Sequence, residues 1–245
     1  MRYLIVLTFM LSATMLLGQD VSLTAQSMYN QLSMIRGDRD FAKKGGYNDE
    51  LQALYLDTDK GPYLENRIYG VSVTFKNEVL RFPDSIEFRF DILNHELQFF
   101  DQDDVPRVVA STSVPEFYLR DWNGTSRRFV KIYPPLVDLT NKDVKYYEVL
   151  STGDYELYKL NYARLNESQF IGPGSDGSVN YSFVKNDLLI VKTKEETYES
   201  VKPKGKQLVK VLPELTKELK AYEKENGKIV DESGLIKFFN SLSNS

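Results

Sequence analysis

The stretch SIEFRFDILNHELQFF, residues 85–100, decides the fold expected for this chain. Apolar side chains occupy the even positions of residues 86–92, and charged side chains lie between them. This period of two is typical of a half-buried β-strand. Apolar residues return at 97–99, but on odd positions. A tight turn at Asn94 and His95 explains the change, because Asn suits a left-handed turn and His tolerates it. The stretch therefore predicts a β-hairpin.

Similar alternation fills most of the middle of the chain. It occurs in RIYGVSVTF (67–75), RVVAS (107–111), EFYLRDW (116–122), RRFVKIY (127–133), KYYEVL (145–150), YELYKLNYARL (155–165), NYSFVK (180–185) and DLLIVKT (187–193). Turn-forming residues separate these patterns at 100–106, 122–125, 151–154, 172–178 and 184–188. LQALYL (51–56) is expected to be a further short strand. Short strands joined by turns predict a mainly β fold, an antiparallel meander forming a sandwich, barrel or half-barrel.

The C-terminal part of the chain predicts a small helical segment. Apolar residues recur there three and four positions apart, as on one face of a helix. Pro213 should divide the first stretch into two helices, and Asn226-Gly227 should end the second one. Asp231 is a candidate N-cap for a final short helix. The residues expected to face inward are Leu212, Leu215, Leu219, Tyr222, Leu235, Phe239 and Leu242.

The chain begins like an exported protein. Arg2 supplies positive charge, LIVLTFMLSATMLL (4–17) is apolar, and Gly18 is a small residue suited to cleavage before Gln19. The run is shorter than the roughly 20 residues that span a bilayer, so a cleaved signal peptide is favoured over an uncleaved anchor. The expected organisation is a signal peptide (1–18), an N-terminal extended segment (19–66), an antiparallel β domain (67–195) and C-terminal helices packed on it (203–242).

The composition narrows the possible chemistry. The net charge is −4, from 31 basic and 35 acidic residues, without a basic tract. Nucleic-acid binding is therefore not expected. The absence of cysteine excludes disulfides, thiolate metal ligands and cysteine nucleophiles. No stretch after residue 18 approaches 18 apolar residues, so no transmembrane helix is expected in the mature chain.

His95 is the only histidine of the chain, which limits the catalytic mechanisms that are open. One histidine cannot build a multi-histidine zinc site, and no G-x-S-x-G element accompanies it. We therefore expect a solvent-exposed turn residue. Asp91 and Glu96 could face each other across the hairpin as a carboxylate pair, but the alternation favours exposed polar positions on a two-faced strand. We assign no catalytic, cofactor-binding or metal-binding residue from the sequence.

Other motifs are incomplete. DQDD (101–104) lacks the glycine and the distant glutamate of an EF-hand, and GPGSDG (172–177) lacks the G-K-[ST] of a phosphate loop. The N-glycosylation pattern occurs at Asn123, Asn166 and Asn180, but it matters only in a eukaryotic secretory pathway. Four aromatic residues could stack on sugars, although packing is the commoner role of strand aromatics. They are Tyr63, Tyr118, Trp122 and Tyr133.

Three stretches resemble a known group of proteins. They are GPYLENRIYG (61–70), LRFPDSIEFRFDILNHELQFF (80–100) and the lysine-rich ending at 204–242. These are similar to uncharacterised exported proteins of Bacteroidota, which carry a G-x-P-Y-L stretch before a strand. In that group an Arg-aromatic-Asn/Asp strand is followed by a short acidic turn and another strand, where this chain has His95. The resemblance implies a Gram-negative periplasm or outer surface, and it implies no activity.

Three functions are compatible with these features. The first is a non-enzymatic exported protein that acts as a binding or interaction module for another envelope component. It is favoured by the export signal, the many strands and the absence of a visible catalytic constellation. The second is a carrier or sensor of a lipid or other apolar ligand held in a curved sheet. The third is a carboxylate-based hydrolase of cell-wall or sugar polymers, which needs two carboxyl groups converging in a cleft.

Overall fold

The computed structural model describes residues 36–40, 49–57, 59–65, 68–75, 78–83, 86–100, 106–109, 114–120, 125–132, 145–169 and 179–243. These residues form a mainly β structure with helices near the C-terminal end. The strands are β1 (Arg36–Asp40), β2 (Tyr69–Phe75), β3 (Glu78–Arg81), β4 (Phe88–Asp91), β5 (Glu96–Phe100), β6 (Pro106–Val109), β7 (Glu116–Arg120), β8 (Ser126–Ile132), β9 (Lys145–Ser151), β10 (Glu156–Gln169), β11 (Val179–Lys192) and β12 (Tyr198–Val201). The helices are α3 (Asp49–Leu56), α4 (Gly205–Val211), the 3-10 turn η2 (Pro213–Leu215), α5 (Thr216–Asn226) and α6 (Glu232–Leu242).

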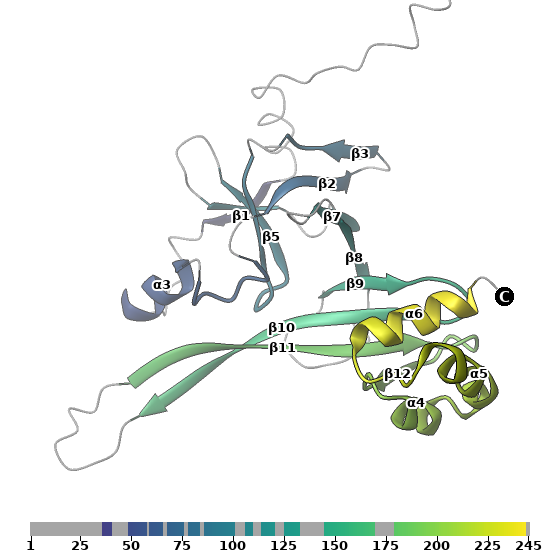
Figure 1. Ribbon diagram of the computed structural model, residues 1–245. Coiled ribbons are helices and arrows are strands. Elements are labelled where there is room, and N and C mark those ends of the chain that lie inside the picture. Colours follow the sequence, from purple (N-terminus) through teal and green to yellow (C-terminus); the bar gives the residue numbers. More distant parts are fainter. Residues whose placement is uncertain are drawn as a thin grey trace, which may run out of the picture. The chain divides into compact units, whose positions relative to one another are not determined.

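The strands form two antiparallel sheets (Figure 1). The larger sheet has eight strands in the order β12-β11-β10-β9-β8-β7-β2-β3, and the smaller sheet has four in the order β1-β6-β5-β4. In the larger sheet β7 to β12 follow one another as a meander, and β2 joins them by pairing with β7. The mainly β fold with an antiparallel meander and C-terminal helices is therefore confirmed.

Within the stretch that predicts the fold, residues 86–100 contain the β4–β5 hairpin. Phe88 pairs with Phe99 at its open end, and His95 ends the turn with a φ of 53°, in the left-handed region. The predicted turn is therefore confirmed, but the predicted exposure of His95 is wrong. Its side chain is only 1% exposed, and its ring packs edge-on against Phe90, with the ring centroids 6.0 Å apart.

Strand β4 is buried on both faces, which the alternating pattern did not indicate. The chain before it runs antiparallel along its other edge, where the N–H groups of Leu64 and Ile68 donate to carbonyls of β4 at 2.9 and 3.0 Å. Asp91 is fully buried and Glu96 is 8% exposed. The prediction that these two carboxylates occupy exposed polar positions is therefore wrong, although they do face each other across the hairpin.

Aromatic rings fill the contact between the two sheets. The Phe90 ring of the smaller sheet lies 5.2 Å from Phe117 and 5.4 Å from Phe129 of the larger sheet. Phe117 and Phe129 stack on each other at 5.0 Å, and Tyr146 meets Phe117 edge-on at 4.9 Å. Each ring is almost completely buried. Because burying one such side chain contributes about 1.5–3 kcal/mol, this aromatic core holds the two sheets together.

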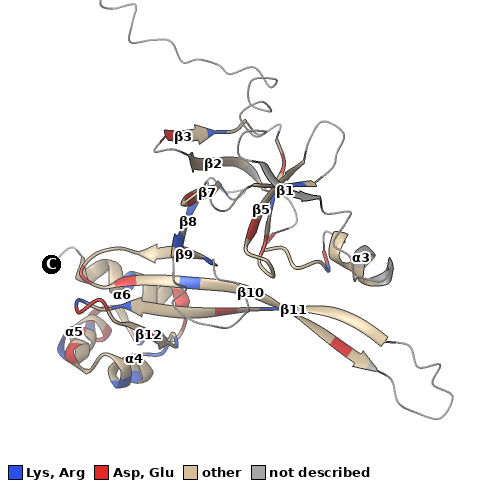
Figure 2. Cartoon of the chain, turned by 180° about the vertical axis from the view of Figure 1, so that it is seen from behind, with Lys and Arg blue, Asp and Glu red and all other residues tan. Residues whose placement is uncertain are grey.

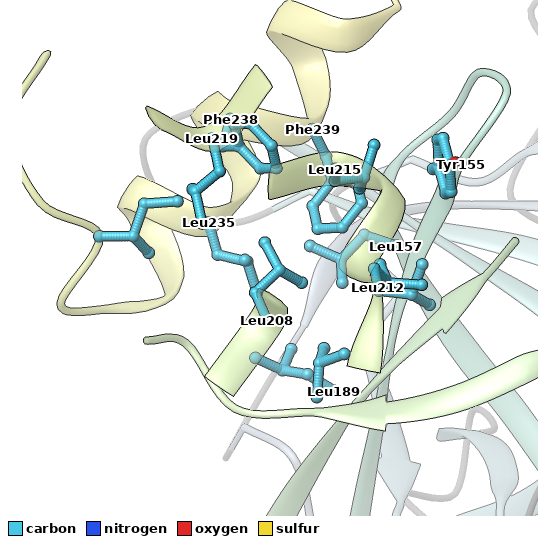
Figure 3. Packing of buried hydrophobic residues seen from close by; sticks show 13 residues of the cluster. Tyr155, Leu157, Leu189, Leu208, Leu212, Leu215, Leu219, Leu235, Phe238 and Phe239 are labelled. Carbon is cyan, nitrogen blue, oxygen red and sulfur yellow. The ribbon is translucent and has the colours of Figure 1, made fainter. Parts of the chain in front are cut away.

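The C-terminal helices cover the ends of β10, β11 and β12 with a second core (Figure 3). Leu157 and Val191 of the sheet contribute to this core, together with Leu208 of α4. The expected break at Pro213 is confirmed, because η2 begins there. Asn226 ends α5, and the Asp231 side chain caps α6 by accepting the Gly234 N–H at 2.8 Å. The predicted inward residues all contribute, namely Leu212, Leu215, Leu219, Leu235 and Phe239 within the cluster and Tyr222 and Leu242 packed against it.

Two local predictions are wrong. LQALYL lies in helix α3 rather than in a strand, because Leu, Gln and Ala favour helices and the buried Leu51 and Tyr55 are four positions apart. Residues 184–188 form no turn but continue β11. Asn186 and Asp187 pair there with Tyr162 and Asn161 of β10, so the ladder overrides their preference for turns.

Several predicted features lie outside the described residues. These are the signal peptide with its cleavage position at Gly18 and Gln19, most of the segment 19–66 before residue 49, the DQDD stretch, the 172–178 loop, and Trp122, Asn123 and Tyr133.

Candidate functional site

Strands β10 and β11 form a long two-stranded ribbon (Figure 1). Each strand has 14 residues, and the pairing runs without interruption from Glu156 opposite Lys192 to Gln169 opposite Val179. Neighbouring strands pair only with its base, since β9 reaches no further than Lys159 and β12 covers 189–192. Among the described strands, the remainder of the ribbon is therefore paired only with itself.

The distal half of the ribbon, residues 164–169 and 179–184, has two different faces. Directly paired residues of an antiparallel ladder share a face, so Leu165 lies beside Phe183. Val179, Tyr181 and Phe183 alternate onto this same face, and these four partly buried side chains form what we call the apolar stripe. The opposite face is exposed and mostly polar, with Asn166, Ser168, Asn180 and Ser182.

Charge is sparse in this half of the ribbon. Arg164 and Glu167 are its charged residues, and Figure 2 shows the distal part mainly uncharged. Glu167 pairs with Tyr181 and so lies on the face of the apolar stripe. The stripe is thus an elongated apolar surface with one acidic position at its side.

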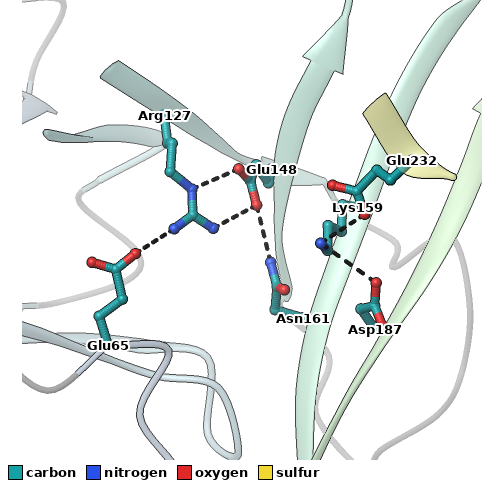
Figure 4. A network of polar contacts seen from close by, with 7 residues as sticks. All are labelled: Glu65, Arg127, Glu148, Lys159, Asn161, Asp187 and Glu232. Atoms are coloured by element: carbon teal, nitrogen blue, oxygen red, sulfur yellow. Dashed lines mark hydrogen bonds and ion pairs between the residues drawn. The ribbon is translucent and has the colours of Figure 1, made fainter. Parts of the chain in front are cut away.

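A polar network fixes the sheet where the ribbon begins (Figure 4). Arg127 of β8 donates two hydrogen bonds to Glu148 of β9, at 2.7 and 2.8 Å, and a third to Glu65 at 2.5 Å. Asn161 of β10 donates to the same Glu148 at 3.2 Å. Glu148 is only 6% exposed, and a bidentate arginine–carboxylate pair in such a site is stronger and better defined than a surface ion pair.

Lys159 links the ribbon to the C-terminal helices. Its ammonium donates to Glu232, the first residue of α6, at 2.8 Å and lies 3.4 Å from a carboxylate oxygen of Asp187. Burial opposes the charge, but the hydrogen bond and the charge of Glu232, helped by Asp187, raise the pKa of Lys159 above its ordinary value. The lysine therefore stays protonated and ties β10, β11 and α6 together.

A cavity of about 280 Å³ opens where the ribbon leaves the sheet. Its lining residues are Leu64, Ile92, Lys159, Asn161, Lys185, Asn186 and Asp187. Burial lowers the pKa of Lys185, and the charge of Asp59 partly offsets this effect. Lys185 and Asp187 share the face of Phe183, because side chains two positions apart in a strand point the same way. The cavity and the apolar stripe therefore lie along one continuous face of the ribbon, with the cavity at its polar end.

The hairpin and helix α3 support the ribbon from the side of the smaller sheet. The Asp91 carboxylate accepts the N–H groups of Leu93 and Asn94 at 2.9 and 3.0 Å and also the Tyr55 hydroxyl. Burial and the charge of Asp91 raise the pKa of Tyr55, so this phenol remains a neutral donor. The Tyr55 ring contacts Phe183 edge-on, with 6.1 Å between the centroids. The Phe183 end of the apolar stripe thus packs against helix α3.

The structure does not bring the sequence-predicted candidates into one site. His95, Asp91 and Glu96 belong to the buried hairpin. Tyr63 is buried as well, and its ring packs against the guanidinium of Arg89, 5.1 Å from the ring centroid. Packing, rather than sugar stacking, accounts for Tyr63.

The sequence predictions missed the ribbon as a candidate site. The alternation of Val179, Tyr181 and Phe183 was visible, but a turn was expected shortly after it. With a turn expected at 184–188, strand β11 was predicted as two separate strands. An uninterrupted strand paired with the long pattern at 155–165 would have indicated the ribbon.

A scan against protein-family models finds no match for this chain, and searches of curated proteins and of solved structures find none either. Within the part of the chain that the structure describes, no helix has both the length and the apolar character needed to cross a membrane. The functional argument therefore depends on the geometry of the chain itself.

Proposed function

We propose that this chain is a non-enzymatic exported protein of the cell envelope that binds a partner protein through the apolar stripe of its ribbon. The observation that carries the proposal is the extension of β10 and β11 beyond their neighbouring strands, with Leu165, Tyr181 and Phe183 aligned on one face. Two-stranded ribbons are marginally stable in water unless their apolar face is covered, and aromatic residues are enriched in protein interfaces. The likeness to exported Bacteroidota proteins supports a location in the periplasm or on the outer surface.

The form of the surface favours a polypeptide over a small ligand. Residues 179–184 span about 20 Å at the usual rise of a strand, which is too long and open to enclose a small molecule. The edges of the ribbon also offer backbone N–H and C=O groups for strand addition, a common mode of peptide recognition. We therefore expect the partner to contribute an extended segment whose apolar side chains cover Tyr181 and Phe183.

No observation on the described residues supports the carrier function or the hydrolase function. Aromatic rings fill the contact between the sheets where an apolar ligand would lie. The buried carboxylates Asp91 and Glu148 are each held by several hydrogen-bond donors. The carrier function and the hydrolase function therefore stay predictions from the sequence. The proposed function is that of an interaction module.

Site-directed photo-crosslinking tests this proposal within the native envelope. A photoreactive phenylalanine analogue replaces Tyr181 in one variant and Ser182 in another. These neighbours lie on opposite faces of the same strand, so they differ in face but hardly in position. We expect a discrete crosslinked species from position 181 and none from position 182. The mass of the species and the peptides within it identify the partner.

Native mass spectrometry of the protein from its own envelope provides the second measurement. A complex that Tyr181→Lys abolishes and Ser182→Lys preserves supports the proposal, and a homodimer with this dependence makes a second copy the partner. Equal crosslinking from both positions, or a monomer that crosslinks from neither, contradicts it.

A further inference from the structure

A second hollow lies on the outer face of the larger sheet, away from the face that meets the aromatic core. It has a volume of about 510 Å³. Its lining residues are Gly70, Ser72, Val79, Arg81, Phe82, Tyr118, Arg120 and Ser126, from β2, β3, β7, β8 and the chain after β3. The alternate residues Val71 and Val73 of β2 are completely buried on the inner face. The hollow is therefore a feature of the opposite, outward surface.

An irregularity of β2 forms the floor of this hollow. The register between β2 and β7 shifts between Tyr69 and Ser72, which stand opposite Arg120 and Tyr118. Gly70 lies in this bulge with a φ of 64°, a conformation that glycine adopts without strain. Because glycine has no side chain, the sheet surface stays open at this point. Bulges of this kind are common beside binding sites, where they redirect neighbouring side chains.

Two arginines flank the floor without a counter-charge. Arg81 and Arg120 are exposed, and among the described residues neither forms an ion pair, whereas Arg128 on the same face is held by Glu116 at 2.8 Å. None of the described residues that line the hollow is acidic. Arg81 stands two strands away from β7, or about 10 Å across the sheet, so the two long side chains can reach one group between them.

We propose that this hollow binds a phosphate monoester carried on a ring-shaped group. The planar guanidinium matches phosphate oxygens in a bidentate manner. A phosphate monoester carries about −1.5 to −2 charges at neutral pH, and the two positive arginines balance this charge. A ligand with a single carboxylate would balance only one of the two arginines. The hydroxyls of Ser72 and Ser126 add donors at the floor and side, and the ring of Tyr118 with Val79 provides an apolar wall for the ring. This site is separate from the ribbon.

Isothermal titration of the untruncated protein with glucose 6-phosphate tests the assignment. Glucose lacks the phosphate, and inorganic phosphate lacks the ring, so each of these probes carries one half of the recognised group. Vesicles of phosphatidylcholine with phosphatidic acid present a phosphate monoester on a lipid. We expect glucose 6-phosphate to bind more tightly than inorganic phosphate, and glucose not to bind. Each of Arg81→Ala and Arg120→Ala should weaken binding by about tenfold or more, the usual loss for a hydrogen bond to a charged group.

Arg164→Ala is the control, because it removes another exposed arginine, one that lies in the ribbon. Arg81→Lys retains the charge but loses the fork geometry, so it should also weaken binding. Circular dichroism verifies that each variant is folded. Arginine-dependent binding to the vesicles alone overturns the ring-shaped carrier, because phosphatidic acid has no ring, and identifies a lipid as the source of the phosphate. Glucose 6-phosphate that does not bind, or that binds no more tightly than inorganic phosphate, overturns the proposal, and so does an equal loss in Arg164→Ala.

Discussion

Replacing Asp91 by alanine should destabilise the protein strongly, because this carboxylate organises the β4–β5 hairpin. Asp91 is fully buried and accepts the N–H groups of Leu93 and Asn94, the Asn94 side-chain amide at 2.7 Å and the Tyr55 hydroxyl. A hydrogen bond to a charged group contributes about 1.5–3 kcal/mol, and each buried donor left unsatisfied costs about 1–3 kcal/mol. These contributions overlap, so we expect a loss of about 4 kcal/mol, or about 8–16 °C in Tm for a chain of this size.

Urea unfolding followed by circular dichroism measures this loss, and Asp57→Ala provides the control. The Asp57 carboxylate accepts two backbone N–H groups in the same manner, from Asp59 at 2.8 Å and from Lys60 at 2.9 Å, but at an exposed position. Asp91→Asn should have an intermediate effect, because it keeps one acceptor oxygen. If Asp91→Ala is no more destabilising than Asp57→Ala, the buried carboxylate of Asp91 does not organise the β4–β5 hairpin, and the reasoning is refuted.

Three further predictions concern other parts of the chain. Gly61→Ala should reduce the free energy of unfolding by about 1–3 kcal/mol through overpacking, because the added Cβ would lie 2.4 Å from the Asp57 carbonyl oxygen. In Gly234→Ala the added Cβ meets nothing closer than 3.4 Å, so this control should be neutral or stabilising in urea unfolding. Asp231→Ala should cost about 1 kcal/mol by loss of the α6 cap, and an unchanged unfolding midpoint would contradict that assignment. Burial, with the charge of Glu214, raises the pKa of Tyr155 from 10.0 to about 12. The folded state holds this proton more tightly, so the contribution to stability is present below pH 10 and lost as the pH rises to about 12. Tyr155→Phe should remove that dependence, and parallel ultraviolet titration and circular dichroism in alkali will show whether it does.

The sequence predicted the fold class well because its strands have a clear period of two and its helices have clear ends. Pro213, the Asn226-Gly227 pair and Asp231 act locally, through a missing N–H, a left-handed position and a capping carboxylate. Such effects can be predicted from a few neighbouring residues. The hairpin turn at Asn94 and His95 was predictable for the same reason.

Burial was harder to predict because it depends on distant parts of the chain. The alternation of residues 86–92 indicates which side chains share a face, but not that Pro62, Leu64 and Ile68 cover the other edge of β4. His95 looked exposed for that reason. Likewise, only the pairing of β11 with β10 shows that the turn-forming residues at 184–188 lie in a strand. The candidate site was missed because it depends on this long pairing.

Strand β10 shows why a polar network occupies the base of the ribbon. Along one face of this strand, Leu157 lies under the C-terminal helices, and Lys159 and Asn161 make polar contacts. At the edge of the same strand, the Ala163 N–H donates to the Ile92 carbonyl at 3.2 Å. Each of these contacts has one specific register, since a shift of one residue would turn the whole face away. A purely apolar strip would tolerate such slippage, whereas a shifted register would separate the partly buried Arg127–Glu148 pair and leave each charge without its partner. We infer that the network around Glu148 sets the register at the base, and that this register positions Leu165 and Phe183 beyond it on the face where the proposed partner binds.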